Sequence, residues 1–130
     1  MTSVVIPWRS GCPYRQRALV WVLGRWAERF PTFDVVLGVH DDGPWCKAAA
    51  VADGLSKVAD GALILADADV WPLRPEALTV AVGALSEYGW AIPHGDVQRL
   101  TETASEAFMA DQPLPPRPWL QTPYPGWAGG

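Results

Sequence analysis

Hydrophobic residues in this chain follow two alternating periodicities over the first hundred or so positions. Short runs of β-branched and other apolar residues predict strands, at positions 4–6, 34–39, 61–66 and 90–93. Between these runs, apolar residues recur at three- and four-residue steps, which predicts helices with one buried face. The helices are expected from Pro13 to Phe30, around 47–58, from Arg74 to Leu85, and from Asp96, a candidate N-cap, to Phe108.

Strands separated by helices of this length are typical of an α/β fold with right-handed crossovers and a mostly parallel sheet. The run 61–66 is apolar throughout, which suits a parallel strand covered on both faces. In such sheets, ligands bind beyond the carboxyl ends of the strands. The segments expected at this edge are Pro7–Arg9, Asp41-Asp42, Asp67–Asp69 and His94.

The pattern changes at residue 111. Prolines crowd the segment 112–118, which can be neither regular helix nor inner strand. The sequence therefore predicts two regions, an α/β domain over 1–110 and a Pro/Gly-rich extended segment over 111–130. The chain ends on a glycine pair, as a natural domain boundary or an interrupted domain would.

Composition narrows the class of protein. Hydrophobic residues make up 49% and charged residues 18% of the 130 positions, which is ordinary for one globular domain with one core. Most of the 8 tryptophans are expected in the core or at its rim, and one or two against a ligand. The net charge of −4 gives no basis for holding a nucleic-acid backbone non-specifically.

The expected cellular compartment is inferred from features that the sequence lacks. No apolar run is long enough to span a bilayer, and no basic segment precedes the first run as in a signal peptide. Cys12 and Cys46 match no metal-site spacing and are too few for a disulfide framework. We therefore expect two reduced thiols in a soluble, cytoplasmic protein.

Two carboxylates directly follow the most apolar predicted strand. Asp67 and Asp69 stand two residues apart, and strand residues at that spacing point to the same side. Hard cations such as Mg²⁺ and Mn²⁺ prefer oxygen ligands and can bridge the oxygens of a diphosphate. The spacing indicates a divalent-cation site, and a solvated Asp-rich loop at a strand end is the alternative.

Three other classes of enzyme place an acid at a strand end. A P-loop nucleoside triphosphatase also needs Gly-x-x-x-x-Gly-Lys-Ser/Thr, which this sequence lacks. Haloacid-dehalogenase phosphatases carry Asp-x-Asp on the first strand, with Thr or Val two residues further on. Here the motif follows the third strand, and Trp71 stands in that place. Sugar nucleotidyltransferases open with a glycine-rich loop after the first strand, where only Gly11 is available.

Three segments, in order, carry a resemblance to a known family. They are Val4–Arg9 at the first strand, Asp41-Asp42-Gly43 after the second and Ala66–Val70 after the third. Over roughly residues 3–110 the chain resembles the glycosyltransferase A fold, in particular family-2-like enzymes, including small versions in actinobacteria and their phages. The resemblance implies a Rossmann-like, mostly parallel sheet with flanking helices. It also implies the nucleotide-diphosphosugar-binding part of a metal-dependent, hexosyltransferase-like enzyme.

The resemblance implies roles for residues near the nucleotide. Pro7, Trp8 and Arg9 would line the nucleotide pocket, with Arg9 available to a phosphate. Asp41 or Asp42 would match the acidic residue near the base or the ribose.

Other implied roles concern the cation and the diphosphate. Asp69 would ligate Mn²⁺ or Mg²⁺ directly, and Asp67 would bind the ribose, or the metal through water. Lys47 would reach the diphosphate, or be a solvated helix lysine. Arg15 and Arg17 are expected to be surface charges on the first helix.

The C-terminal segment Gly126–Gly130 looks like the start of the glycine-rich stretch that passes under the donor sugar in this family, with Gly129 as a substrate contact. A flexible terminus is the alternative. His94 would be an acceptor-side or phosphate contact, or a structural histidine at a strand end.

One departure from the family leaves the catalytic residue unassigned. The acidic segment after the glycine-rich stretch, which supplies the base of inverting members, has no counterpart here, and Asp96, Glu102 and Glu106 lie too early in the chain. A complete enzyme of this fold is roughly twice as long. We expect either a glycosyltransferase that uses a UDP- or GDP-sugar and an unidentified acceptor, or a non-catalytic nucleotide-binding or interaction module. An exposed edge in an incomplete domain would also favour homo-oligomers.

Overall fold

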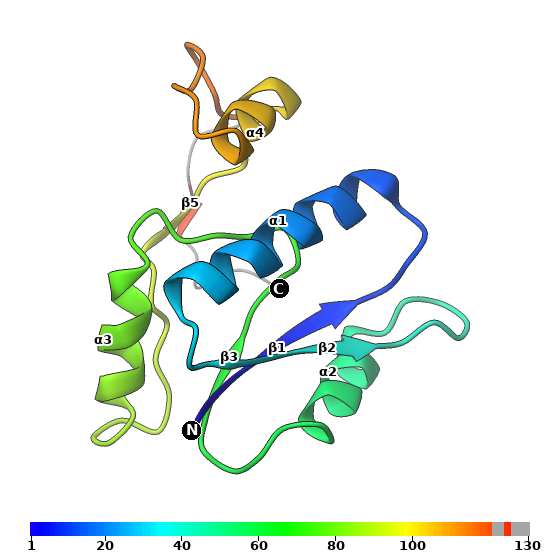
Figure 1. Ribbon diagram of the computed structural model, residues 1–130, viewed down its shortest axis with the longest axis vertical. Coiled ribbons are helices and arrows are strands. Elements are labelled where there is room, and N and C mark those ends of the chain that lie inside the picture. Colours follow the sequence, from blue (N-terminus) through cyan, green and yellow to red (C-terminus); the bar gives the residue numbers. More distant parts are fainter. Residues whose placement is uncertain (121–123, 126–130) are drawn as a thin grey trace. The chain divides into compact units, whose positions relative to one another are not determined.

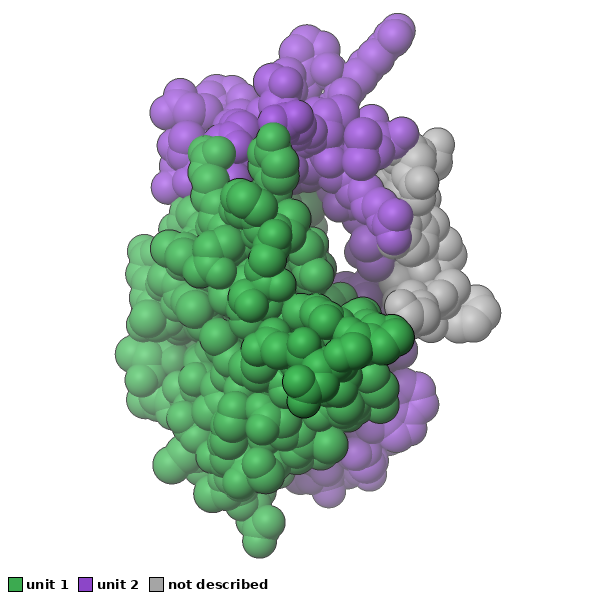
Figure 2. Space-filling view, turned by 90° about the vertical axis from the view of Figure 1, so that its right-hand side faces the viewer, with its two compact units in different colours: residues 1–75 green, residues 76–130 purple. Residues whose placement is uncertain are grey.

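The computed structural model describes residues 1–120 and 124–125 and divides the chain into two compact units. The first unit is Met1–Pro75 and the second is Glu76–Gly130, drawn in green and purple in Figure 2. The functional division expected at residue 110 stays a prediction. None of the helices in the described ranges combines the length and the apolar composition needed to cross a membrane.

The first unit contains a three-stranded parallel sheet. Its elements are β1 (Thr2–Trp8), α1 (Pro13–Arg29), β2 (Asp34–Val39), α2 (Lys47–Leu55) and β3 (Ala62–Leu65) (Figure 1). The strand order is β2-β1-β3, and β1 pairs in parallel with both neighbours. The expected α/β class and parallel sheet are therefore confirmed for this unit.

β1 lies at the centre of the sheet because it is apolar on both faces. All residues from Ser3 to Trp8 are buried, and Val4, Val5 and Ile6 have no exposed surface. The chain passes from β1 to β2 through α1, and from β2 back across β1 to β3 through α2. Right-handed crossovers that run in opposite directions lie on opposite faces, so α1 and α2 cover the two faces of β1 (Figure 1).

Helix α1 buries the apolar stripe predicted from its spacing. Leu19, Val22 and Trp26 are buried, whereas residues 13–17 and 27–29 of the helix are exposed. Pro13 occupies the first turn, where a missing N–H costs nothing. The last turn closes with a bond from the Phe30 N–H to the Trp26 carbonyl, at 2.9 Å.

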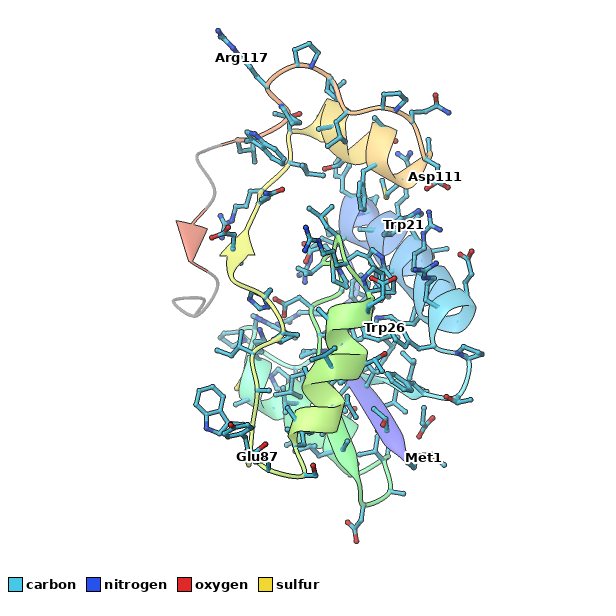
Figure 3. The ribbon with its side chains drawn as sticks, turned by 90° about the vertical axis from the view of Figure 1, so that its left-hand side faces the viewer. Met1, Trp21, Trp26, Glu87, Asp111 and Arg117 are labelled. Carbon is cyan, nitrogen blue, oxygen red and sulfur yellow. The ribbon has the colours of Figure 1, made fainter. Side chains whose placement is uncertain are left out.

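An aromatic cluster lies at the C-terminal half of α1; its members are Trp21, Trp26, Phe30, Phe33 and Trp71. The ring centroid of Trp26 lies 5.2 Å from that of Trp71 and 5.5 Å from that of Phe30. Trp21 reaches Trp71 edge-on at 6.3 Å, and Phe30 stacks on Phe33 at 4.8 Å. Figure 3 shows Trp21 and Trp26 on their helix. The cluster joins α1 to the segment that follows β3.

Helix α2 lies on β2 with its backbone in contact with the strand. A Cβ atom at Gly38 would overlap the carbonyl oxygen of Ala50, and a Cβ atom at Gly54 would overlap a methyl group of Val5. The Gly38 Cα lies 3.3 Å from the position of a Cβ at Gly54. Glycine at both positions is therefore what lets the helix approach so closely. This approach holds α2 against β2 and β1.

β3 departs from the expected strand in its length and its cover. It spans Ala62–Leu65 rather than 61–66, and Leu63 and Leu65 are 36% and 58% exposed. Their register partners in β1 lie under α2, which packs mainly on β2 and β1. The expectation that this strand is covered on both faces is therefore wrong. Within the described residues, β3 pairs with β1 alone.

The second unit holds shorter elements, α3 (Glu76–Ala84), β4 (Asp96–Val97), α4 (Glu102–Met109) and β5 (Tyr124–Pro125), with β4 and β5 antiparallel. Two expectations are wrong in this unit. Residues 90–93 form no strand, and Pro93 there lacks the N–H that a ladder needs. The helix expected from Asp96 begins at Glu102, because the Thr101 hydroxyl caps it by accepting from the Ala104 N–H at 3.1 Å. The proline-rich residues 112–118 form neither helix nor strand, as predicted.

Candidate functional site

The three parallel strands end at one edge of the first unit, named here the carboxyl edge. The His40 N–H donates to the Trp8 carbonyl at 3.4 Å, and the Ala66 N–H donates to the Val5 carbonyl at 3.1 Å. β2 therefore stays paired with β1 to the end of that strand, whereas the pairing of β3 ends at Val5. The segments that leave the sheet there are 9–12, 40–46 and 66–70. They contain Asp41-Asp42, Asp67–Asp69 and, from the expected segment Pro7–Arg9, Arg9 alone.

Arg9 ties the first of these segments to the second. Its Nη2 donates to the backbone carbonyl of Asp41 at 3.2 Å. Asp41 and Asp42 are exposed, and Gly43 adopts a φ of 61°, which closes the turn in a conformation that suits glycine. Arg9 bonds to the backbone carbonyl of Asp41 and not to a carboxylate. The carboxylate oxygens of Asp41 and Asp42 therefore remain as further acceptors in this exposed turn.

Pro7 and Trp8, which are expected to line the nucleotide pocket, belong to the buried part of β1. Both are buried, and only 6% of Trp8 is exposed. The Arg15 guanidinium lies over the Trp8 ring, 5.7 Å from its centroid, within the range of a cation–π contact. Arg15, expected as a plain surface charge, therefore covers this ring at the carboxyl edge. Pro7 and Trp8 are thus packed at the end of β1, and Arg9, which follows them, is partly exposed.

Asp67 and Asp69 lie in a turn rather than on the strand. β3 ends at Leu65, so the alternation of a strand does not set the directions of these two side chains. Ala68 between them is 1% exposed, whereas both aspartates are exposed. A buried alanine thus anchors the turn and leaves a carboxylate on either side of it at the surface.

Lys47 reaches the carboxyl edge, as one of its two expected roles requires. It is the first residue of α2, and its Nζ lies 2.8 Å from Oδ1 of Asp67. The two side chains are 53% and 52% exposed. The ion pair links the start of α2 to the turn after β3 and places a cation beside the predicted metal ligand.

Asp53 is a positioning residue that the sequence reasoning missed. Its Oδ2 accepts from the Val39 N–H at 2.7 Å and from Lys57 Nζ at 2.6 Å, and Lys57 also donates to the Leu37 carbonyl at 2.8 Å. These bonds tie α2 to the end of β2, just before the Asp41 turn. The signal was present in the spacing of Asp53 and Lys57, because acid and lysine four residues apart pair on a helix.

The hydrogen bond from Lys57, followed by that from the Val39 N–H, lowers the pKa of Asp53. A folded-state pKa below the unfolded value means that Asp53 stabilises the fold above its ordinary pKa of about 4, and that this contribution is lost as pH falls through the lower folded-state pKa. We expect Asp53→Asn to lower the urea midpoint at pH 7, with the gap to the wild type closing as pH falls below about 4 and through the lower folded-state pKa. Asp60→Asn removes an exposed carboxylate outside this network, and a similar loss there would contradict the assignment.

Other residues singled out from the sequence stand apart from these contacts. Gly129 lies outside the described residues. His94 was expected at the carboxyl edge because of a strand at 90–93, and that strand does not form. Cys12 and Cys46 are free thiols at the N-cap positions of α1 and α2, so both belong to segments that leave this edge.

Comparisons of this chain with protein-family models, with curated protein sequences and with solved structures find no match. Function is therefore inferred from the chemistry of the carboxyl edge. Cationic side chains such as Arg9 and Lys47 suit phosphate oxygens, and carboxylates suit hydroxyl groups or a hard cation. The acidic residues available at this edge are Asp41, Asp42, Asp67 and Asp69.

Proposed function

We propose that this chain binds a nucleoside diphosphate sugar at the carboxyl edge and forms the donor-binding part of a glycosyltransferase with the A fold. The observation that supports this most is the convergence of two contacts at the ends of three parallel strands, the Arg9–Asp41 bond and the Lys47–Asp67 ion pair. Open parallel sheets bind nucleotides at this edge. Together the contacts provide both the positive and the negative groups that a nucleotide with a bound cation needs.

Each charged group has a role in this proposal. Arg9 and Lys47 bind diphosphate oxygens, and Asp41 or Asp42 accepts hydrogen bonds from the ribose or the base. Asp69, with Asp67, holds a divalent cation. The nucleotide thus lies across the segments that follow β1, β2 and β3, with its diphosphate nearest to β3.

The donor set suits a cation that is shared with the nucleotide. In the part of the chain that the structure describes, no three His, Cys, Asp or Glu side chains gather to hold a metal ion. Mg²⁺ and Mn²⁺ are commonly bound through one or two carboxylates, with substrate phosphates and water completing the shell. Asp67 and Asp69 supply such a pair of exposed carboxylates. The residues fit a metal that arrives with the diphosphate rather than a cage made of protein alone.

In the proposed reaction, the sugar leaves its diphosphate for a nucleophile of the acceptor, and negative charge develops on the diphosphate. A divalent cation, held by Asp67 and Asp69, would neutralise part of that charge. Arg9 and Lys47 add positive charge from the protein at the edge where the diphosphate lies. The acceptor and the residue that deprotonates it are unassigned.

Asp69→Ala is expected to weaken Mn²⁺-dependent nucleotide binding by at least about 10-fold, because a carboxylate ligand of the shared cation is lost. The measurement is calorimetric titration of UDP, and then of GDP, with and without Mn²⁺. The variant should keep the wild-type circular dichroism spectrum, since the side chain is exposed.

Asp60→Ala is the matched control, because Asp60 is also exposed but precedes β3 at the opposite, amino end of the strand. It should bind nucleotide as the wild type does. Equal binding by wild type and Asp69→Ala would refute the proposed cation site. Release of UDP or GDP from the corresponding sugar nucleotides then separates an enzyme from a module that binds donor without turning it over.

A further inference from the structure

Lys47 stands where a helix by itself disfavours a cation. It is the first residue of α2, and the N-terminus of a helix carries a partial positive charge. The first turn has no acidic residue, and the N-cap Cys46 makes no side-chain capping bond. The charge of Lys47 is compensated from outside the helix, by Asp67 at 2.8 Å. An ammonium group therefore sits on the carboxylate that the proposed function assigns to a divalent cation.

This ion pair can be exchanged at little cost. Both side chains are about half exposed, at 53% and 52%, and exposed ion pairs contribute little to stability. The ammonium group of lysine stands on a flexible stem of four carbons, so it can move by several ångströms while the Cα stays in place. That Cα is fixed, because α2 is held to β2 by the Gly38–Gly54 contact and by Asp53.

We propose, on the basis of the function proposed above, that Lys47 holds the place of the divalent cation at Asp67 until nucleotide binds. On binding, Asp67 exchanges the ammonium group for the cation, and Lys47 turns to a diphosphate oxygen. Each carboxylate and phosphate then keeps a positive partner. A cation that arrives without nucleotide must displace Lys47 with no phosphate to receive it, so cation and nucleotide bind cooperatively.

Lys47→Met tests the exchange, because methionine keeps much of the side-chain length and removes the charge. Mn²⁺ alone, measured as free ion by electron paramagnetic resonance, should bind the variant about two- to ten-fold more tightly than the wild type. UDP or GDP titrated in saturating Mn²⁺ should bind it about ten-fold more weakly. Lys47→Arg keeps the charge and should restore the weak binding of Mn²⁺ alone.

Arg25→Met is the matched control, because Arg25 also forms an ion pair, with Glu28 near the C-terminal end of α1, and the substitution removes the same charge away from the carboxyl edge. Its affinity for Mn²⁺ alone should equal that of the wild type. If Lys47→Met leaves that affinity unchanged while Asp69→Ala abolishes nucleotide binding, the exchange is wrong and the proposed function stands. If the wild type binds neither Mn²⁺ nor nucleotide, both are overturned.

Discussion

Gly38→Ala is expected to destabilise this protein by at least about 3 kcal/mol, which is a large share of the stability of an ordinary domain. A Cβ atom at this position would overlap the carbonyl oxygen of Ala50 and would lie 3.0 Å from the Gly54 nitrogen. Both neighbours are backbone atoms of α2, so no side-chain rotation can relieve the overlap. The helix must move off the sheet, and urea denaturation followed by circular dichroism would report the loss.

Gly24→Ala is the control for that experiment. Gly24 lies inside α1, and a Cβ there would meet no atom within 4 Å. Alanine is favoured over glycine within a helix by roughly 1 kcal/mol, so this variant should be more stable than the wild type. Substitution by alanine is thus expected to lower the free energy of unfolding at Gly38 and to raise it at Gly24. A wild-type urea midpoint for Gly38→Ala would show that α2 does not lie as close to β2 as the structure has it.

Trp26→Ala is expected to cost about 3–5 kcal/mol, because it removes the centre of the aromatic cluster. Trp26 is 2% exposed, and its ring lies within 6.5 Å of the rings of Phe30, Phe33 and Trp71. Loss of the indole leaves a cavity between rigid rings that cannot collapse readily. The measurement is again the free energy of unfolding from urea titration.

Two further substitutions separate the causes of that loss. Trp45 is 42% exposed, so Trp45→Ala should cost about 1 kcal/mol or less. Trp26→Phe keeps a ring in the cluster and removes a buried indole N–H that has no hydrogen-bond partner among the described residues. An unpartnered buried donor is costly, so this change should cost much less than Trp26→Ala. Equal losses for Trp26→Ala and Trp45→Ala would contradict the cluster as the main support of α1.

Sequence patterns predicted the parts of the fold that depend on local periodicity. The buried run of β1 and the stripe of Leu19, Val22 and Trp26 needed only the spacing of apolar residues. The parallel order of the strands then followed from the lengths of the connections. For the same reason, the charged residues after β1, β2 and β3 were expected at one edge of the sheet, where the structure has them.

The features that the sequence did not predict depend on contacts between distant residues. In the sequence, Gly38 and Gly54 are residues that would each weaken a strand or a helix. Their role becomes clear only from the contact between them, which joins positions 16 residues apart. From the sequence alone, Asp53 is indistinguishable from an ordinary surface acid. The structure shows that its carboxylate accepts a hydrogen bond from the Val39 N–H at 2.7 Å. The burial of β3 depends on how far α2 extends over the sheet. The residue types of Leu63 and Leu65 do not show that this face of the strand is exposed.

The central place of β1 has a consequence for how the sheet assembles. Among the described residues, the strand at the start of the chain pairs with both other strands of its sheet, and its register partners include Asp34 and Ala62. Bringing such distant segments together costs loop entropy before any ladder forms, so parallel sheets of this kind fold slowly. During synthesis, β1, which is buried from Ser3 to Trp8, must therefore wait until Leu65 has been added before its second flank is covered. The step that limits folding is expected to be this long-range closure rather than the formation of α1.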